Sequence, residues 1–221
     1  MKLLIFVLSV KDNGLYSAYY NAQRATWDNL IVPDVQTMYY FGKGAAREHS
    51  NEIHTDAHEA RYNVGMKFIK ALEQIKELDY DFMFRTNSCS YVDKQLLHDH
   101  LSTIKDDKYY SGIMGDCNGY KYGSGCGFIM TKKLADILVE QKDKFRYDWV
   151  DDIAVGERLA NNGATIVTSK RFDFEQHRGE QIPKDYFHYR LRHLDPHRAP
   201  EVQYMREIFD VKYNNKQVII K

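Results

Sequence analysis

Short apolar runs alternate along this chain with segments whose apolar residues recur every three or four positions. Residues 3–10 are almost continuously apolar, as in a strand that is covered on both faces. Further along, Met66, Ile69 and Leu72 follow the spacing of one helix face. Because strands that alternate with helices form mostly parallel sheets with helices on both sides, the sequence predicts an α/β sandwich.

The same reasoning predicts the remaining elements. Strands are expected at residues 35–41, 80–85, 109–114, 128–130 and 164–168. Helices are expected at residues 16–30, 55–78, 96–104, 132–141 and 201–209, and from Asp151 to a stop at Asn161-Asn162-Gly163. A glycine-rich turn is expected at residues 123–127. The chain of 221 residues suits a single domain, with a core at 1–170 and a C-terminal extension at 171–221.

Composition and charge exclude several classes of partner. Lys plus Arg and Asp plus Glu both total 31, so the net charge is zero and no broad surface for nucleic acid is expected. No run is long and apolar enough to span a membrane, and no signal-peptide cleavage site follows residues 3–10. Three cysteines without a close-spaced framework indicate thiols in a reducing compartment. We therefore expect a cytoplasmic protein.

Two adjacent carboxylates, Asp151 and Asp152, stand at the start of a predicted helix. The helix dipole and exposed amides keep such carboxylates ionised, so either can accept a proton as a general base. Acids also begin many helices without any catalytic role, and taken alone this pair fits that description better. The surrounding pattern decides between the two interpretations.

Several segments occur in an order that resembles one family. They are Arg24-Ala25-Thr26-Trp27, Tyr40-Phe41-Gly42, Tyr62 with Lys67, Phe84-Arg85-Thr86, Gly125-Cys126-Gly127-Phe128-Ile129-Met130-Thr131 and Asp151-Asp152-Ile153-Ala154-Val155-Gly156. This set is similar to the fringe and β-1,3-galactosyltransferase superfamily of glycosyltransferases. The resemblance implies a GT-A (Rossmann-like) fold, a nucleotide-sugar donor such as a UDP-sugar, a glycan acceptor and an inverting mechanism. It also implies that Asp152 is the general base and that Asp151 orients it or the acceptor.

The resemblance further implies where the two substrates lie. The donor is expected beyond the carboxyl ends of the strands. The expected donor residues are Ser9, Val10, Lys11, Arg85, Thr86, Asn87 and Ser88. The expected acceptor residues are Gly125, Cys126, Gly127 and Trp149, although Trp149 is equally well explained as a core anchor.

The chain departs from the family where acids normally hold a divalent metal on the donor diphosphate. Asn87-Ser88-Cys89 occupies these positions, and amide, hydroxyl and thiol groups are poor ligands for Mn²⁺ or Mg²⁺. We therefore expect no required metal cofactor. Positive charge for the leaving group is expected instead from His188, Arg190, Arg192 and His193, with Arg85 and His177-Arg178 in reserve. A solvated basic tail explains this segment equally well.

Two other functions remain open at this stage. The missing acids are compatible with a catalytically inactive GT-A-like module that binds a nucleotide or a glycan. A nucleotidyltransferase is a weaker alternative, because Lys11-Asp12-Asn13-Gly14 is a poor match to the basic glycine-rich loop of those enzymes. Either a stand-alone enzyme or one module of a larger glycosyltransferase fits the sequence.

Overall fold

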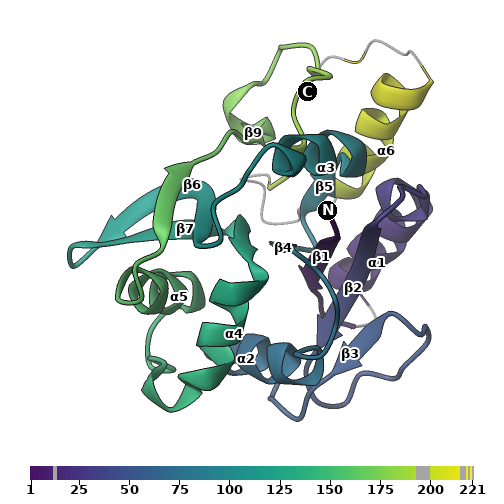
Figure 1. Ribbon diagram of the computed structural model, residues 1–221. Coiled ribbons are helices and arrows are strands. Elements are labelled where there is room, and N and C mark those ends of the chain that lie inside the picture. Colours follow the sequence, from purple (N-terminus) through teal and green to yellow (C-terminus); the bar gives the residue numbers. More distant parts are fainter. Residues whose placement is uncertain (12–13, 193–199, 215–217, 219, 221) are drawn as a thin grey trace.

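The computed structural model describes residues 1–11, 14–192, 200–214, 218 and 220. Its centre is a seven-stranded sheet in the order β3-β2-β1-β4-β7-β6-β8 (Figure 1). Only β7 runs against its neighbours, so the sheet is mostly parallel and the predicted α/β architecture is confirmed. The strands are β1 (Leu3–Leu8), β2 (Val35–Phe41), β3 (Glu52–His54), β4 (Phe82–Asn87), β6 (Tyr109–Cys117), β7 (Tyr120–Thr131) and β8 (Thr165–Thr168).

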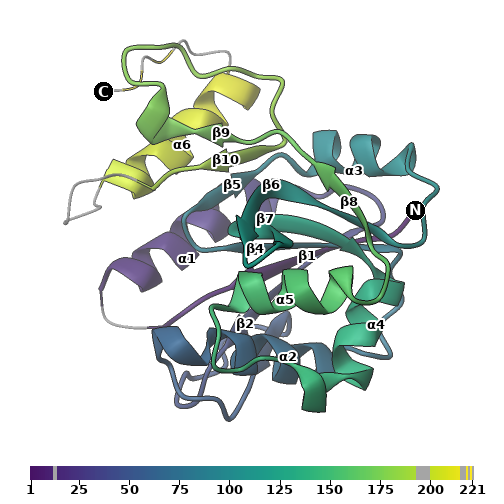
Figure 2. The same cartoon turned by 90° about the vertical axis from the view of Figure 1, so that its left-hand side faces the viewer.

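Helices cover both faces of this sheet. Helices α2, α4 and α5 lie on one face, and α1, α3 and α6 lie on the other (Figure 2). Within the described residues, none of these helices combines the length and apolar character needed to cross a lipid bilayer. The helices are α1 (Leu15–Ala25), α2 (Val64–Gln74), α3 (Lys94–Ser102), α4 (Lys132–Glu140), α5 (Asp151–Ala160) and α6 (Pro200–Tyr213).

The central strand β1 explains why its sequence is apolar at every position. Ile5 and Val7 contribute to the core beneath α1 and α3, whereas Leu4 and Phe6 contribute to the core beneath α2 and α4. Successive side chains of a strand point to opposite faces, so a strand between two helical layers needs apolar residues on both. Each such side chain stabilises the fold by about 1.5–3 kcal/mol.

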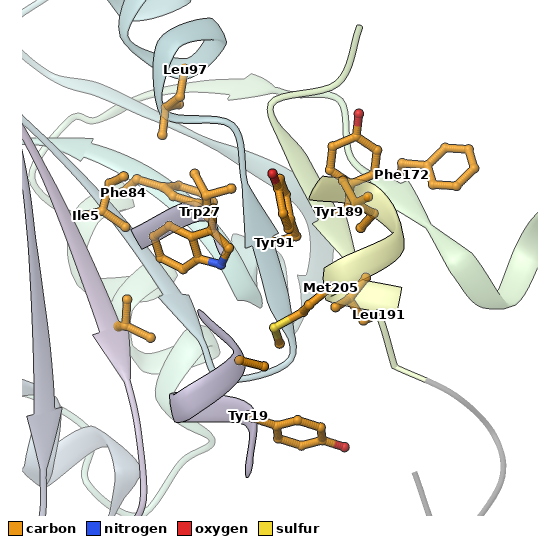
Figure 3. Close-up of a cluster of buried hydrophobic side chains, with 14 of the residues drawn as sticks. Ile5, Tyr19, Trp27, Phe84, Tyr91, Leu97, Phe172, Tyr189, Leu191 and Met205 are labelled. Carbon is orange, nitrogen blue, oxygen red and sulfur yellow. The ribbon is translucent and has the colours of Figure 1, made fainter. Parts of the chain in front are cut away.

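A second, three-stranded sheet joins the C-terminal segment to the core. Its order is β5 (Ser90–Val92), β10 (His188–Arg190) and β9 (Phe172–Asp173), and β5 follows directly after β4. Tyr91 of β5 and Tyr189 of β10 meet edge to face at 5.9 Å in the cluster that also contains Met205 of α6 (Figure 3). The segment after residue 170 therefore shares one core with α1 and α3.

Two predicted helices are longer than the observed ones. The helix expected at 55–78, with Thr55 or Asp56 as its cap, begins only at Val64, after a 3-10 turn at Arg61–Asn63, and Asp56 pairs with Lys70. The Thr55 hydroxyl donates instead to the carbonyl of Phe41, at the end of the neighbouring strand. The helix expected at 16–30 ends at Ala25 and is followed by the 3-10 turn Trp27–Asn29.

The expected glycine-rich turn at 123–127 is wrong, because these residues lie within β7. The turn lies earlier, at Asn118 and Gly119, whose φ values of 52° and 80° suit the two-residue turn of a β-hairpin. Strand β7 nevertheless bulges where the glycines occur. Gly112 pairs with Phe128 and Met114 pairs with Gly123, so four residues of β7 oppose one of β6. We call residues 124–127 the β7 bulge.

Candidate active site

The sheet order reverses between β1 and β4, and a cavity opens at that point. The chain passes from β1 to β2 on one side, whereas β4 pairs with the other side of β1. Ligands of open α/β sheets bind beyond the carboxyl ends of the strands at such a switch point. The cavity has a volume of about 380 Å³ and is lined by Leu8, Val10, Tyr16, Glu59, Ala60, Arg61, Val64, Lys67, Asn87, Ser88 and Cys89. Three of the lining residues, Val10, Asn87 and Ser88, are among those that the sequence predicted for the donor.

A buried lysine, Lys67, stands in the wall of this cavity. Its ammonium donates to the carbonyl of Ser9 at 3.1 Å and to the carboxylate of Glu59 at 2.6 Å. Burial lowers the pKa of Lys67, and the contact with Glu59 opposes that effect. Lys67 was not among the predicted donor residues. The signal in the sequence is its position at helical spacing from Val64 and Ala71, which places it on the buried face of α2.

Arg85 of β4 ties the acid pair to the central sheet. The residue is 1 % exposed, and its Nε donates to the hydroxyl of Tyr40 at 3.0 Å. Its two terminal nitrogens donate to the carbonyl of Gly125 and, at 2.6 Å, to the carboxylate of Asp151. All three nitrogens of the guanidinium therefore have partners, and Arg85 links β2, β7 and α5 rather than facing a ligand.

Asp152 lies against the β7 bulge at the first turn of α5. Its carboxylate accepts from the amide of Gly125 at 2.8 Å and from the amide of Ile153 at 3.0 Å. Burial raises the pKa of Asp152, and the nearby charge of Asp151 raises it further. Asp152 is thus a stronger base than an ordinary aspartate, and it adjoins the segment predicted for the acceptor.

Close packing of α5 on the hairpin fixes the position of both acids. A Cβ added to Gly156 would lie 2.5 Å from the carbonyl of Lys121, so only glycine lets the helix approach β7 this closely. Val150, the N-cap residue before the helix, provides no side-chain cap. Two causes therefore favour acids at these positions: their contacts with Arg85 and Gly125, and the general stabilisation of negative charge at a helix N-terminus.

The β7 bulge is held from its other side by β4 and β5. The carbonyl of Cys126 accepts from the hydroxyls of Thr86 at 2.7 Å and Ser90 at 3.1 Å. A Cβ added to Gly127 would lie 2.7 Å from Nδ1 of His188, so the absence of a side chain there is required by packing. The predicted acceptor residues Gly125 and Cys126 therefore occupy a bulge that two neighbouring segments hold in place, a common arrangement beside active sites.

Residues 188–193, which were predicted to supply positive charge to the leaving group, do not form one cluster of free cations within the described residues. His188 is 2 % exposed and bonds Ser90 through Nε2 at 3.1 Å. Burial, together with the nearby Arg171 and Arg190, places the pKa of His188 well below its ordinary value, so it carries no charge at neutral pH. Arg190 donates to Asp173 at 3.2 Å, Arg192 is exposed, and His193 lies outside the described residues.

A second arginine, Arg171, approaches the bulge and was missed from the sequence. It donates to Asp173 at 3.1 Å and to the hydroxyl of Ser124 at 3.0 Å. Residue spacing gives no signal for this contact, because 47 positions separate Arg171 from Ser124.

Two further predicted residues are engaged away from the cavity. The ammonium of Lys11 bonds the buried carboxylate of Glu52 at 2.9 Å. Trp149 is half-buried beside the acid pair, and the guanidinium of Arg146 lies 4.2 Å from the centre of its ring. Trp149 also packs against the core beneath α2, α4 and α5, so both of its predicted roles remain open.

The residues after β4 do not fit a divalent metal. The side-chain oxygen of Asn87 already accepts from the amide of Cys89 at 3.2 Å and from the hydroxyl of Ser90 at 3.4 Å. In the described part of the chain, the one cluster of three potential ligand side chains is Glu48, His49 and Glu52, next to Lys11 at the edge of the sheet. Hard cations prefer several carboxylate oxygens, and the end of β4 offers none.

No protein-family model matches the chain, and no curated protein matches it at a significant level. Function is therefore inferred from the geometry of the site.

Proposed function

We propose that this protein is an inverting GT-A-type glycosyltransferase that moves a sugar from a nucleotide-sugar donor, such as a UDP-sugar, to a hydroxyl of a glycan. The observation that supports the proposal is Asp152, a carboxylate of raised pKa held against the β7 bulge, whose Cys126 bonds Cys89 in the wall of the cavity at the switch point of the sheet. A nucleotide fits a cavity of this position, and a sugar hydroxyl at the bulge would meet Asp152.

The proposed step needs one base and one stabilised leaving group. Asp152 removes the proton from the acceptor hydroxyl, and that oxygen attacks the anomeric carbon of the donor. The bond to the nucleoside diphosphate breaks on the opposite face of the sugar, so the configuration is inverted. Asp151 takes no part in the proton transfer. Its ion pair with Arg85 at 2.6 Å fixes the start of α5 and so the direction of Asp152.

Lys67 is one of two cations in the wall of the cavity, with Arg61, that can meet the departing diphosphate. It lines the cavity, and Glu59 and Ser9 account for two of the three protons of its ammonium. Arg85 is buried and does not line the cavity, and His188 is neutral. Because no step in this scheme passes through a metal, we expect donor binding to be unaffected by a chelator.

A second candidate, an inactive module that binds a nucleotide or glycan, is favoured by one observation. Both acids already have partners, since Asp151 pairs with Arg85 and Asp152 accepts two amides. A purely structural acid pair would look the same. Turnover of a donor, by transfer or by hydrolysis, separates the two candidates, because a module of this kind binds without consuming its ligand.

The experiment is a calorimetric titration of nucleotide sugars and free nucleoside diphosphates, with Mn²⁺ and with a chelator, followed by a turnover assay. Asp152→Asn is expected to lower the rate of transfer by about 10²–10⁴-fold and to leave donor affinity within about twofold. Asp148→Asn is the matched control, because Asp148 is an exposed acid of the same loop that pairs with Arg146.

Three results would count against the proposal in different ways. Equal loss of donor affinity and rate in Asp152→Asn would remove Asp152 from the role of base. Binding of a donor without any turnover in the wild type would favour the inactive module. Binding that requires Mn²⁺ would contradict the metal-independent scheme.

A further inference from the structure

Two cysteines from different elements lie next to each other between the cavity and the acid pair. Cys89 follows β4 and lines the cavity, and Cys126 belongs to the β7 bulge. The hydroxyls of Thr86 and Ser90, on either side of Cys89 in the sequence, both donate to the carbonyl of Cys126. The main chain at Cys126 is therefore fixed to the segment that carries Cys89.

Both thiols bond the side chain of Asn87. The Cys89 thiol lies 3.1 Å from the side-chain oxygen of Asn87, and the Cys126 thiol bonds both Cys89 and Asn87. The contact with Cys89 lowers the pKa of Cys126 well below its ordinary value, and the charges of Arg190 and Arg171 act in the same direction against the effect of burial. A thiolate is the nucleophilic form of cysteine, so Cys126 is the reactive member of the pair.

We propose that Cys126 is a site of oxidation by hydrogen peroxide and that Cys89 is its resolving partner. The Cys126 sulfur attacks one peroxide oxygen and the O–O bond breaks. This yields a sulfenic acid on Cys126, and the departing hydroxide takes up the proton that the Cys126 thiol released on ionisation, so that it leaves as water. The Cys89 sulfur then attacks the sulfenic sulfur, the S–O bond breaks, and a second water leaves. Two thiols and one peroxide thus become one disulfide and two waters.

The disulfide would join the wall of the cavity to the bulge beside the base. Cys126 immediately follows Gly125, whose amide holds the carboxylate of Asp152 at 2.8 Å. Cross-linking this residue to Cys89 would change the geometry on both sides of the site at once. Slower sugar transfer after oxidation rests on the proposed function, whereas the thiol chemistry does not.

Peptide mapping tests the chemistry without any assay of activity. The full chain, with its three thiols, is treated with one equivalent of hydrogen peroxide, blocked with iodoacetamide and digested under non-reducing conditions. We expect titratable thiols to fall from three to one, a cross-linked peptide that contains Cys89 and Cys126, and full reversal by dithiothreitol.

Two variants sharpen the test. Cys117→Ser removes the thiol at the far end of β6, away from the pair, and should form the same cross-link. Cys89→Ser should form no cross-link but should accumulate a sulfenic acid on Cys126 that dimedone labels. Oxidation of Cys117 at the same rate as Cys126, or cross-links only between separate molecules, would overturn the proposal.

Discussion

Replacing Arg85 with methionine measures how much one buried guanidinium contributes to the stability of the folded protein. Methionine keeps the apolar packing between the rings of Phe68 and Phe128, which lie 5.7 and 5.4 Å from the guanidinium. It removes the partners of Tyr40, Gly125 and Asp151. Loss of one member of a buried ion pair costs about 3–5 kcal/mol.

The lower end of that range applies here, because the side chain of Asp151 remains 14 % exposed and water can partly replace Arg85. A loss of about 3 kcal/mol corresponds to a fall of about 6–12 °C in Tm for a domain of this size. Thermal unfolding followed by circular dichroism measures it. Arg146→Met is the control, since solvent screens the exposed Arg146–Asp148 pair and its loss should change stability little. Equal shifts in the two variants would refute the organising role of Arg85.

Two further predictions concern the packing beneath the bulge. The pKa of His188 in the folded state lies below its value of about 6.5 in the unfolded chain. As the pH falls below about 6.5, the unfolded chain binds a proton that the folded protein excludes, so the free energy of unfolding decreases. Urea midpoints from pH 7.5 to 5.5 should therefore fall more in the wild type than in His188→Gln, and parallel curves would exclude His188 as the cause. Gly127→Ala should lower the free energy of unfolding by about 1–3 kcal/mol, because its Cβ would lie 2.7 Å from Nδ1 of His188 and 2.9 Å from Cζ of Phe84. An unchanged urea midpoint would show that His188 can move aside.

The central strands could be predicted because their residues are buried on both faces. The strand expected at 35–41 has the observed bounds of β2, and the apolar run at 3–10 contains β1. The short strands β3 and β5 were missed. Three residues are too few to show a period, and β5 forms only because β10, almost one hundred positions away, pairs with it.

The acid pair could be located from the sequence, whereas its partners could not. A helix start is marked by local signals, so the positions of Asp151 and Asp152 followed from spacing alone. The roles of Arg85, Lys67 and Arg171 depend on contacts between distant segments. Asn118-Gly119 is a local signal for a hairpin turn, and such a turn predicts that the glycines at 123–127 lie within the second strand.

The pairing of β5 with β10 also sets the order in which the protein can assemble during synthesis. Ser90 and His188, which bond across these strands, are 98 positions apart. At about 5–20 residues per second, a ribosome needs on the order of 5–20 s to make the second strand after the first. Throughout that interval Tyr91 has no Tyr189 to pack against, and the core beneath α1 and α3 lacks α6. The nascent chain therefore passes through a stage with an unpaired strand and exposed aromatic rings. Aggregation is most favoured at that stage, and a chaperone that covers these groups would prevent it.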